Sequence, residues 1–289
     1  MGPFSDATAL VDHVTELVVL PEVYLRVQQL LNDRNTSAAD IGRIINADPA
    51  LTARLLKIAN SPYFGMAARI DTISRAVTIM GTQHLHDFLL ATSVTSAFVD
   101  LPEPRPDLNR FWLRSTRCAI ISRLIAIDCN VLENERVFVA GLLNDIGHLV
   151  MYQLMPGPTA EAEACAEAQG QSLAAVEREL FFGYDYADVG SLLLQRWNLP
   201  PMLSEIIRHH NEPDQARRFP LETAIVHAAR VICSVIEKRD RAADALPLIA
   251  PFAAQQIQLN KEKLDNIEIT ANHQLTETAN LLVPKMHAA

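Results

Sequence analysis

Hydrophobic residues recur at intervals of three and four along nearly the whole chain, and nowhere do they alternate regularly with polar residues. One such stripe consists of Leu51, Leu55, Ile58 and Ala59, and a second runs from 139 to 150. This spacing places apolar side chains on one face of an α-helix, whereas a half-buried strand needs strict alternation. The chain has only 10 glycines in 289 residues. The pattern therefore predicts an all-α, multi-helix protein with about a dozen helices.

Several of the predicted helices have recognisable start and stop signals. Ser37 and Asp40 form a capping-box pattern before "IGRII", in which each side chain can accept a backbone N–H at the helix start. Asp48 followed by Pro49 joins an N-cap to a proline in the first turn, where its missing N–H is not needed. Gly81 follows "TISRAVTIM" and is predicted to end that helix.

The stretch "LPEPRP", residues 101–106, contains three prolines and cannot continue a helix. It is predicted to be an extended connector. We expect it to divide the chain into an N-terminal helical lobe, residues 1–101, and a C-terminal helical lobe, residues 107–289.

Composition narrows the possible classes of protein. The formal charge is −9 with a pI of about 5.5, which disfavours binding to nucleic acid and to anionic membranes. The four cysteines form no C-x-x-C pair and are interpreted as reduced thiols. Charges interrupt every long apolar run, and the chain does not begin like a signal peptide. We expect a soluble cytoplasmic protein without a membrane partner.

Common catalytic and cofactor motifs are missing from the sequence. It contains no P-loop, no G-x-G-x-x-G, no G-x-S-x-G, no H-E-x-x-H and no EF-hand loop. No cofactor is therefore expected.

Two histidine clusters are candidates for metal binding. His84, His86 and Asp87 lie at the start of a predicted helix, where Asp87 suits the positive end of the helix dipole. A solvated helix start is favoured over a metal site there. His209 and His210 lie in the last turn of another helix. Their position is equally compatible with contacts to the final carbonyls and with a ligand role.

A polar trio, Asn144, Asp145 and His148, interrupts the apolar helix predicted for "FVAGLLNDIGHLVMYQLM". On a helical wheel Asp145 lies at the edge of the apolar stripe, and the other two lie four residues apart on the opposite face. A carboxylate at the edge of a core needs a partner, because an unpaired charge is costly in a low dielectric. That partner could be a metal, an arginine or backbone N–H groups.

Six stretches carry a resemblance to a known family. They are "INADPALTARLLKIANSPYFG", "ISRAVTIMG", "RFWLRSTRCA", "FVAGLLNDIGHLVMYQL", "FGYDYADVGSLLLQRWNLP" and "IIRHHNEP". They resemble the HDOD (HD-related output domain) family, and the resemblance extends over about residues 17–213. The resemblance implies a two-lobed all-α fold whose C-terminal lobe is related to the HD metal-dependent phosphohydrolases. In those enzymes histidines and aspartates bind metal ions that activate water. Residues after 213 are expected to add helices to the C-terminal lobe.

The resemblance also shows which metal ligands this chain would lack. Arg114 stands at the place of the first histidine, Asn144 at the histidine of the His-Asp pair, and Tyr186 at a later histidine. Arg230 lies near the place of the final aspartate. Asp145 remains, together with the histidine pair at 209–210.

An arginine only donates hydrogen bonds and cannot bind a cation, but Arg114 can pair with Asp145. The site is therefore interpreted as the remnant of a metal site, and no bound metal is expected. A pocket for a ligand or partner is predicted at Arg114, Asp145, His148, His209 and His210.

Three functions follow as hypotheses. The favoured one is a non-catalytic bacterial signalling module that binds a partner protein or a small ligand. A phosphohydrolase would need an altered ligand set made of Asp145, His209 and His210 with Asp185 or Asp188. A nucleic-acid regulator would use the N-terminal helices, but residues 21–81 carry only seven positive and five negative side chains. This excess is small for a protein that contacts phosphates, so nucleic acid is not expected as a partner.

Overall fold

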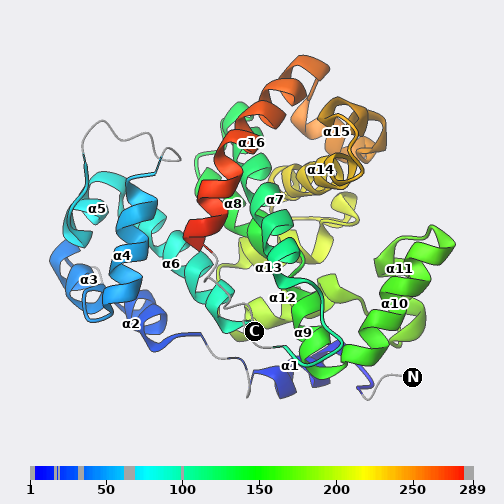
Figure 1. Cartoon of the computed structure of the whole chain (residues 1–289), viewed down its shortest axis with the longest axis horizontal. Coiled ribbons are helices and arrows are strands. Elements are labelled where there is room, and N and C mark those ends of the chain that lie inside the picture. The colour runs from blue at the N-terminus through cyan, green and yellow to red at the C-terminus, as the bar shows by residue number, and fades with distance from the viewer. Residues whose placement is uncertain are drawn as a thin grey trace. The chain divides into compact units, whose positions relative to one another are not determined.

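The computed structural model describes residues 4–15, 18, 20–31, 36–61, 69–98 and 101–282 (Figure 1). Within these residues the chain forms sixteen α-helices and two 3-10 helices, without a strand. The all-α class predicted from the apolar spacing is confirmed, although the helices are more numerous than predicted because several are only seven or eight residues long.

The chain divides into two compact units. The larger unit consists of Met1–Val18 and Asp100–Ala271, and the smaller unit of Val19–Val99 and Asn272–Ala289. The helices of the smaller unit are α2 (Glu22–Leu31), α3 (Ala38–Ile45), α4 (Pro49–Ala59), α5 (Ile73–Met80) and α6 (Thr82–Ala97). Those of the larger unit are α1 (Ala7–Val14), α7 (Leu108–Asp128), α8 (Asn134–Leu143), α9 (Ile146–Leu154), α10 (Pro156–Gln169), α11 (Leu173–Leu180), α12 (Tyr186–Arg196), α13 (Pro201–His209), η1 (Pro213–Gln215), α14 (Pro220–Glu237), η2 (Ala242–Leu248) and α15 (Pro251–Ile257). The last helix, α16 (Lys261–Leu282), contributes residues to both units.

The units differ at both chain ends from the predicted lobes, 1–101 and 107–289. Helix α1 belongs to the larger unit, where Leu10, Val11 and Val14 are buried and the helix contacts α9 and α12. The C-terminal part of α16 belongs to the smaller unit, where the Thr95 hydroxyl donates to the carbonyl of Leu282 at 2.7 Å. Residues 101–106 are non-helical, as their prolines predicted.

Local sequence signals fix the helix starts of the smaller unit. The capping box of Ser37 and Asp40 is present. Asp48 accepts the backbone N–H of Leu51 at 3.0 Å at the start of α4. Gly81 separates α5 from α6 at a φ of +90°, a conformation that a side chain would strain. Helices α3 and α4 both contact α5 (Figure 1). In the stretch "ANSPYFG", residues 62–65 lie outside the described residues.

The interpretation of His86 and Asp87 as a solvated helix start is wrong. Both side chains are buried, because every residue of α6 from Leu85 to Thr95 is buried. The amide of Gln83 donates to Asp87 at 3.0 Å, and the ring of His86 lies 5.2 Å from that of Tyr24. The sequence of a helix that is buried on all sides need not show separate apolar and polar faces. The burial of this helix could therefore not be predicted from the spacing of its apolar residues.

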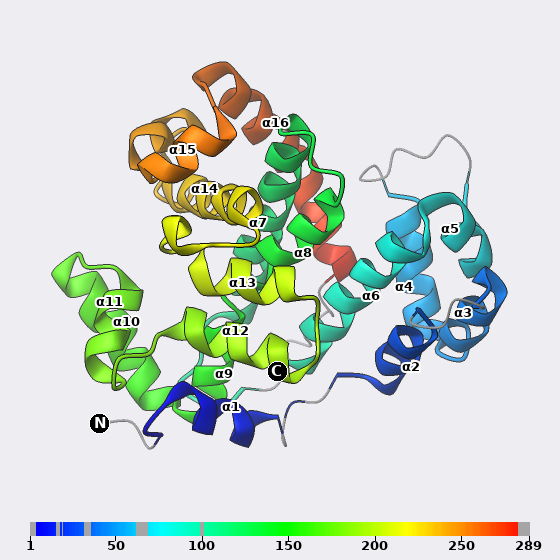
Figure 2. The same ribbon diagram turned by 180° about the vertical axis from the view of Figure 1, so that it is seen from behind.

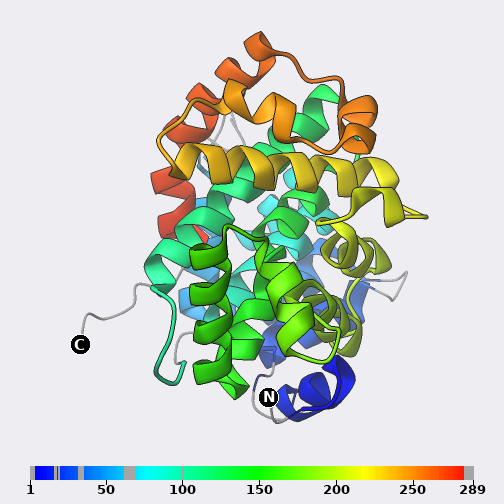
Figure 3. The ribbon, with the colours of Figure 1, turned by 90° about the vertical axis from the view of Figure 1, so that its right-hand side faces the viewer.

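The larger unit is built around pairs of long helices. Helix α7 lies beside α8 and α14, and α12 contacts both α9 and α13 (Figure 2). Helices α10 and α11 contact each other, and they also contact α9 and α12, respectively (Figure 3). The stretch Asn134–Leu154 is long and apolar enough to cross a membrane, but 89% of its most apolar window is buried inside the fold. The position of this stretch in the core thus accounts for its apolar composition.

The buried position of Leu55 on α4 gives the first prediction. Its side chain is 1% exposed, so Leu55→Ala should lower the free energy of unfolding by about 2–5 kcal/mol through lost burial and the cavity left behind. Denaturant unfolding followed by circular dichroism measures this change. Leu56→Ala is the matched control, since Leu56 is only half-buried and should cost clearly less. Equal losses of unfolding free energy in the two variants would contradict the assignment of Leu55 to the buried face of α4.

Candidate functional site

Asn144 and Asp145 occupy a break between two helices. Helix α8 ends at Leu143 and α9 begins at Ile146, so the predicted continuous helix with a polar face is wrong. Every residue from 139 to 150 is buried. The amide of Asn144 donates to the carbonyl of Gly141 at 2.7 Å and closes the turn. The break lets the backbone place a polar pair inside the core instead of on a helix surface.

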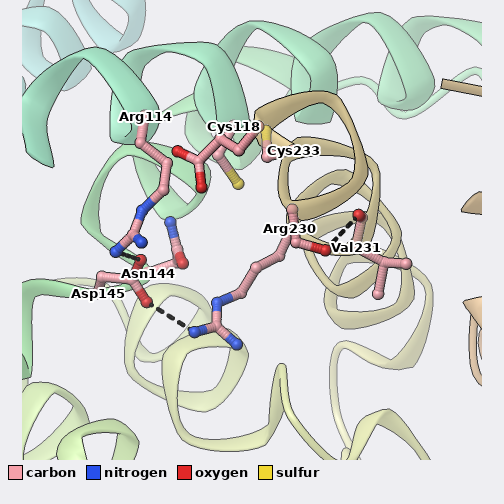
Figure 4. Close-up of a pocket in the computed structure, with 9 residues that line it drawn as sticks. Arg114, Cys118, Asn144, Asp145, Arg230, Val231 and Cys233 are labelled. Atoms are coloured by element: carbon pink, nitrogen blue, oxygen red, sulfur yellow. Dashed lines mark hydrogen bonds and ion pairs between the residues drawn. The ribbon is translucent and has the colours of Figure 1, made fainter. Parts of the chain in front are cut away.

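The carboxylate of Asp145 is held by two guanidinium groups. Arg114 Nη2, from α7, lies 2.9 Å from Asp145 Oδ2, and Arg230 Nη2, from α14, lies 3.2 Å from Oδ1 (Figure 4). The side chain of Asp145 is only 3% exposed. Burial alone would raise its pKa, but the charges of Arg230 and Arg114 outweigh burial and hold this pKa well below its usual range. The ion pair predicted between Arg114 and Asp145 is confirmed, and Arg230 is an additional partner.

Arg230 is itself fixed by neighbouring groups. Its Nη1 donates to the side-chain oxygen of Asn211 at 2.8 Å. Its guanidinium carbon lies 5.2 Å from the centre of the Tyr186 ring, within the range of a cation–π contact. Arg230 therefore bridges Asp145, Asn211 and Tyr186.

Tyr186 takes the place at which the family resemblance implied a histidine. Its ring stacks on that of His148, with centroids 3.9 Å apart. Its hydroxyl lies 3.1 Å from His210 Nε2 and 3.0 Å from Asn211 Oδ1. Burial raises the pKa of Tyr186, so the hydroxyl keeps its proton. A Cβ on Gly147 would overlap the carbonyl oxygen of Tyr186, so the close approach of α9 to α12 at this point requires a glycine.

His148 contacts a buried carboxylate that the sequence did not reveal. His148 Nε2 lies 3.3 Å from Glu177 Oε1. The other oxygen of Glu177 accepts the backbone N–H of Tyr186 at 2.8 Å. Glu177 belongs to an ordinary amphipathic helix, "LAAVEREL", and local sequence gives no indication that its side chain is fully buried.

His209 and His210 lie in different surroundings. His210 is buried, and its Nδ1 donates to the carbonyl of Ile207 at 2.7 Å, which is the contact to a final carbonyl proposed for this position. Burial and the charge of Arg230 lower the pKa of His210 to about 3, so its ring is neutral and Nε2 is an acceptor. His209 instead lines a separate pocket with Arg208, Arg217 and Arg218.

The altered ligand set considered from the sequence is not brought together. Asp185 caps α12 by accepting the backbone N–H of Ala187 at 2.8 Å, and Asp188 lies 3.1 Å from Arg208. Within the described residues, no group of three or more His, Cys, Asp and Glu side chains is arranged to hold a metal ion.

The residues at the implied metal positions do not fit a divalent cation. Both oxygens of Asp145 are engaged by guanidinium groups, and these groups carry positive charge and have no lone pair for a metal. The nitrogen of the Asn144 amide donates to Gly141, and its oxygen is buried without a hydrogen-bond partner. The guanidinium groups at positions 114 and 230 therefore oppose a cation at this site.

Two cavities adjoin the arginine pair. The smaller, about 180 Å³, is the pocket drawn in Figure 4, lined by Arg114, Cys118, Asn144, Asp145, Arg230, Val231, Cys233, Ser234 and Glu237. The larger, about 750 Å³, shares Arg114, Arg230 and Glu237 with it and also includes His148. Of the predicted pocket residues, Arg114 and Asp145 line the smaller cavity, while His209 and His210 line neither.

Comparison with known proteins agrees with this architecture. The profile of the HDOD domain matches residues 17–213. The chain belongs to the HDOD family.

Solved structures extend the HDOD likeness over nearly the full chain. The protein named "Putative phosphohydrolase" from Shewanella amazonensis SB2B is 28% identical, with a TM-score of 0.77 over 98% of this chain and 100% of that one. The "Putative signal transduction protein" from Marinobacter aquaeolei VT8 is 18% identical, with a TM-score of 0.69 over 94% of this chain and 61% of that one; at this identity it shows the fold alone. An "Uncharacterized protein" from Treponema pallidum (strain Nichols) is 26% identical over 228 residues. The HDOD chain covers 78% of its own length in that match, but only 44% of the length of the relative.

Arg230 is a second residue whose role the sequence did not reveal. It was recognised only as a replacement for an aspartate, not as a second partner of Asp145. The available indication was its position in the apolar run "AIVHAARVICSVI", because an arginine in a buried helix needs a counter-charge. No local pattern identifies which carboxylate supplies it.

The shared carboxylate predicts a specific loss of stability. Asp145→Asn should lower the free energy of unfolding by about 1–3 kcal/mol, less than the roughly 3–5 kcal/mol of a fully buried pair, because it removes the counter-charge of two guanidinium groups that are 38% and 33% exposed. Asp128→Asn is the matched control, since Asp128 forms a half-exposed pair with Lys263 at 2.7 Å and should cost about 0–1 kcal/mol. Chemical denaturation of both variants measures the difference, and a small equal effect would show that the Asp145 cluster contributes little.

His210 predicts a dependence of stability on pH. Its folded pKa of about 3 lies below the ordinary value of about 6.5, so the unfolded chain binds a proton that the folded chain does not. Stability should therefore fall as the pH is lowered from about 6.5 towards 3, by at most about 1.4 kcal/mol per pH unit for this group. Half-buried His227, whose pKa burial also lowers, acts in the same direction.

The variant His210→Gln isolates this contribution. The measured quantity is the slope of unfolding free energy against pH between about 5 and 6, a window above the ordinary carboxylate pKa values. The slope should be smaller in His210→Gln than in the unchanged protein, whatever the absolute stability of the variant. His13→Gln, at an exposed position, should leave the slope unaltered. An unchanged slope in His210→Gln would mean that His210 is protonated in the folded state.

Proposed function

We propose that this HDOD protein is a non-catalytic signalling module that binds a partner protein or a small ligand. The observation that carries the proposal is the pairing of Asp145 with both Arg114 and Arg230. In this interpretation the cluster is the remnant of a metal site, in which the positive charge of the guanidinium groups balances the Asp145 carboxylate in place of a metal ion.

The chemistry of the cluster argues against hydrolysis. A metal-dependent phosphohydrolase needs lone pairs from imidazole and carboxylate groups to hold ions that activate water. Here Asp145 Oδ2 already accepts from Arg114, and Oδ1 is paired with the charge of Arg230. The buried histidine, His210, lies against the Tyr186 hydroxyl and the Ile207 carbonyl. Neither group is left to bind a metal without a rearrangement of the core.

Names among the relatives support a module of either kind, signalling or phosphohydrolase-like. The Marinobacter protein carries a signal-transduction name and the Shewanella protein a phosphohydrolase name. The replaced donors at positions 114, 144 and 230 favour the signalling role. A binding domain also needs a stable site, and the network from Asp145 through Arg230 to Tyr186 supplies one.

Metal analysis and turnover test the proposal. Purified protein, exposed to Mn²⁺, Fe²⁺ or Zn²⁺ and then desalted, should retain no stoichiometric metal by elemental analysis. It should release no more p-nitrophenol from p-nitrophenyl phosphate or its diester than a blank. Asn144→His should behave in the same way, because Arg114 and Arg230 still oppose a cation beside the new imidazole.

A metal content of one or two ions per chain, together with turnover that a chelator abolishes, would sink the proposal. The phosphohydrolase hypothesis would then replace it.

A further inference from the structure

The larger of the two cavities beside the arginine pair has the size of a small-molecule site. Its volume of about 750 Å³ lies within the range of about 300–1,000 Å³ typical of ligand pockets. Its walls come from α7, α9, α10 and α14 and from the turns that follow α10 and α14. All of these elements belong to the larger unit.

A molecule that enters this cavity meets the guanidinium groups before it meets Asp145. The side chains of Arg114 and Arg230 are 38% and 33% exposed, whereas that of Asp145 is 3% exposed. Two positive groups share a single carboxylate, so the cluster keeps a surplus of one positive charge. Arg110, one turn before Arg114 on α7, and Lys238, directly after α14, add two exposed cations to the lining.

Four acidic residues also line the cavity: Asp107, Glu163, Glu167 and Glu237. Asp107 is engaged as the N-cap of α7 and accepts the backbone N–H of Asn109 at 3.0 Å. Glu237 lies close enough to raise the pKa of Arg114, although Asp145 does so more strongly. The remaining two, Glu163 and Glu167, belong to α10, and Glu163 accepts the Tyr152 hydroxyl at 2.7 Å. The cations thus lie on α7 and at the end of α14, where Glu237 lies beside them, and the other two carboxylates, Glu163 and Glu167, lie on α10.

The arginines retain hydrogen-bond donors for a second acceptor. Each Nη atom carries two hydrogens. Asp145 accepts one hydrogen from Arg114 Nη2 and Asn211 accepts one from Arg230 Nη1, while Arg230 Nη2 lies 3.2 Å from Asp145 Oδ1 as an ion pair. Both arginines line the cavity, and each keeps N–H hydrogens beyond those already donated, on a side chain that the buried carboxylate holds in place. Such preorganisation lowers the entropy cost of binding.

We propose that this cavity binds a phosphorylated small molecule. Its phosphate group accepts from Arg114 and Arg230, and hydrogen-bond donors at its other end reach Glu163 and Glu167 on α10. Phosphate suits the site because it carries up to two negative charges and several acceptor oxygens, which match paired guanidinium forks. The inference deepens the proposed function and rests on it, since a ligand that is bound without being hydrolysed is what a signalling module requires.

Binding of inorganic phosphate tests the role of the cationic side chains that line the cavity: Arg110, Arg114, Arg230 and Lys238. At about pH 8, where the phosphate is mostly a dianion, its binding is measured by isothermal titration calorimetry at constant ionic strength, with sulfate and acetate as further probes. Phosphate should bind, and acetate more weakly. Arg114→Lys, which keeps the charge on Asp145 but loses the fork, should weaken phosphate binding about tenfold, the effect of losing one charged hydrogen bond.

Matched lysine variants separate the site from the general surface charge. Lys238→Gln should weaken phosphate binding, whereas Lys261→Gln should not, since Lys261 is equally exposed but lies on α16 outside the cavity. Adenosine 5′-monophosphate should bind more tightly than inorganic phosphate, and Glu163→Gln should reduce that advantage.

Absence of phosphate binding, or equal weakening by Lys238→Gln and Lys261→Gln, would overturn the inference. Unchanged phosphate affinity in a folded Arg114→Lys variant would overturn it as well. These results would leave the proposed lack of hydrolysis intact, because turnover and metal content are measured separately.

Discussion

The arrangement of the larger unit depends on one buried carboxylate. Asp145 lies in the break between α8 and α9 and joins it to α7 through Arg114 and to α14 through Arg230. A carboxylate buried without a partner would cost several kcal/mol, so neither arginine can leave without a penalty to the fold. The three segments are distant in sequence, and this single group sets where their side chains meet.

The same interaction decides what chemistry the site can perform. HD-type hydrolysis uses lone pairs of imidazole and carboxylate groups to hold cations, whereas Arg114 and Arg230 supply only N–H donors at this site. Guanidinium groups in place of lone-pair donors oppose a cation there. The fold is shared with the Shewanella structure, to which the TM-score is 0.77.

Buried histidines around the cluster serve as neutral connectors. His210 donates to Ile207 and lies against the Tyr186 hydroxyl. His227 donates to the carbonyl of His210 at 2.8 Å and accepts the backbone N–H of Ala250 at 3.0 Å. Burial lowers the pKa of both rings, and a neutral imidazole can donate on one side and accept on the other. The positive charge of the region is thereby confined to the arginines.

The sequence by itself determined the helical class and several helix caps. Apolar spacing and capping depend on residues within one or two turns, so Ser37 with Asp40 and Asp48 with Pro49 could be read directly. The Arg114 pair followed only through the family resemblance. Tertiary structure alone decided that Arg230 also reaches Asp145, that Glu177 lies beneath His148, that His86 and Asp87 are buried, and that α1 joins the larger unit. These features depend on which distant helix faces pack together, and local periodicity shows that a face is apolar without showing what covers it.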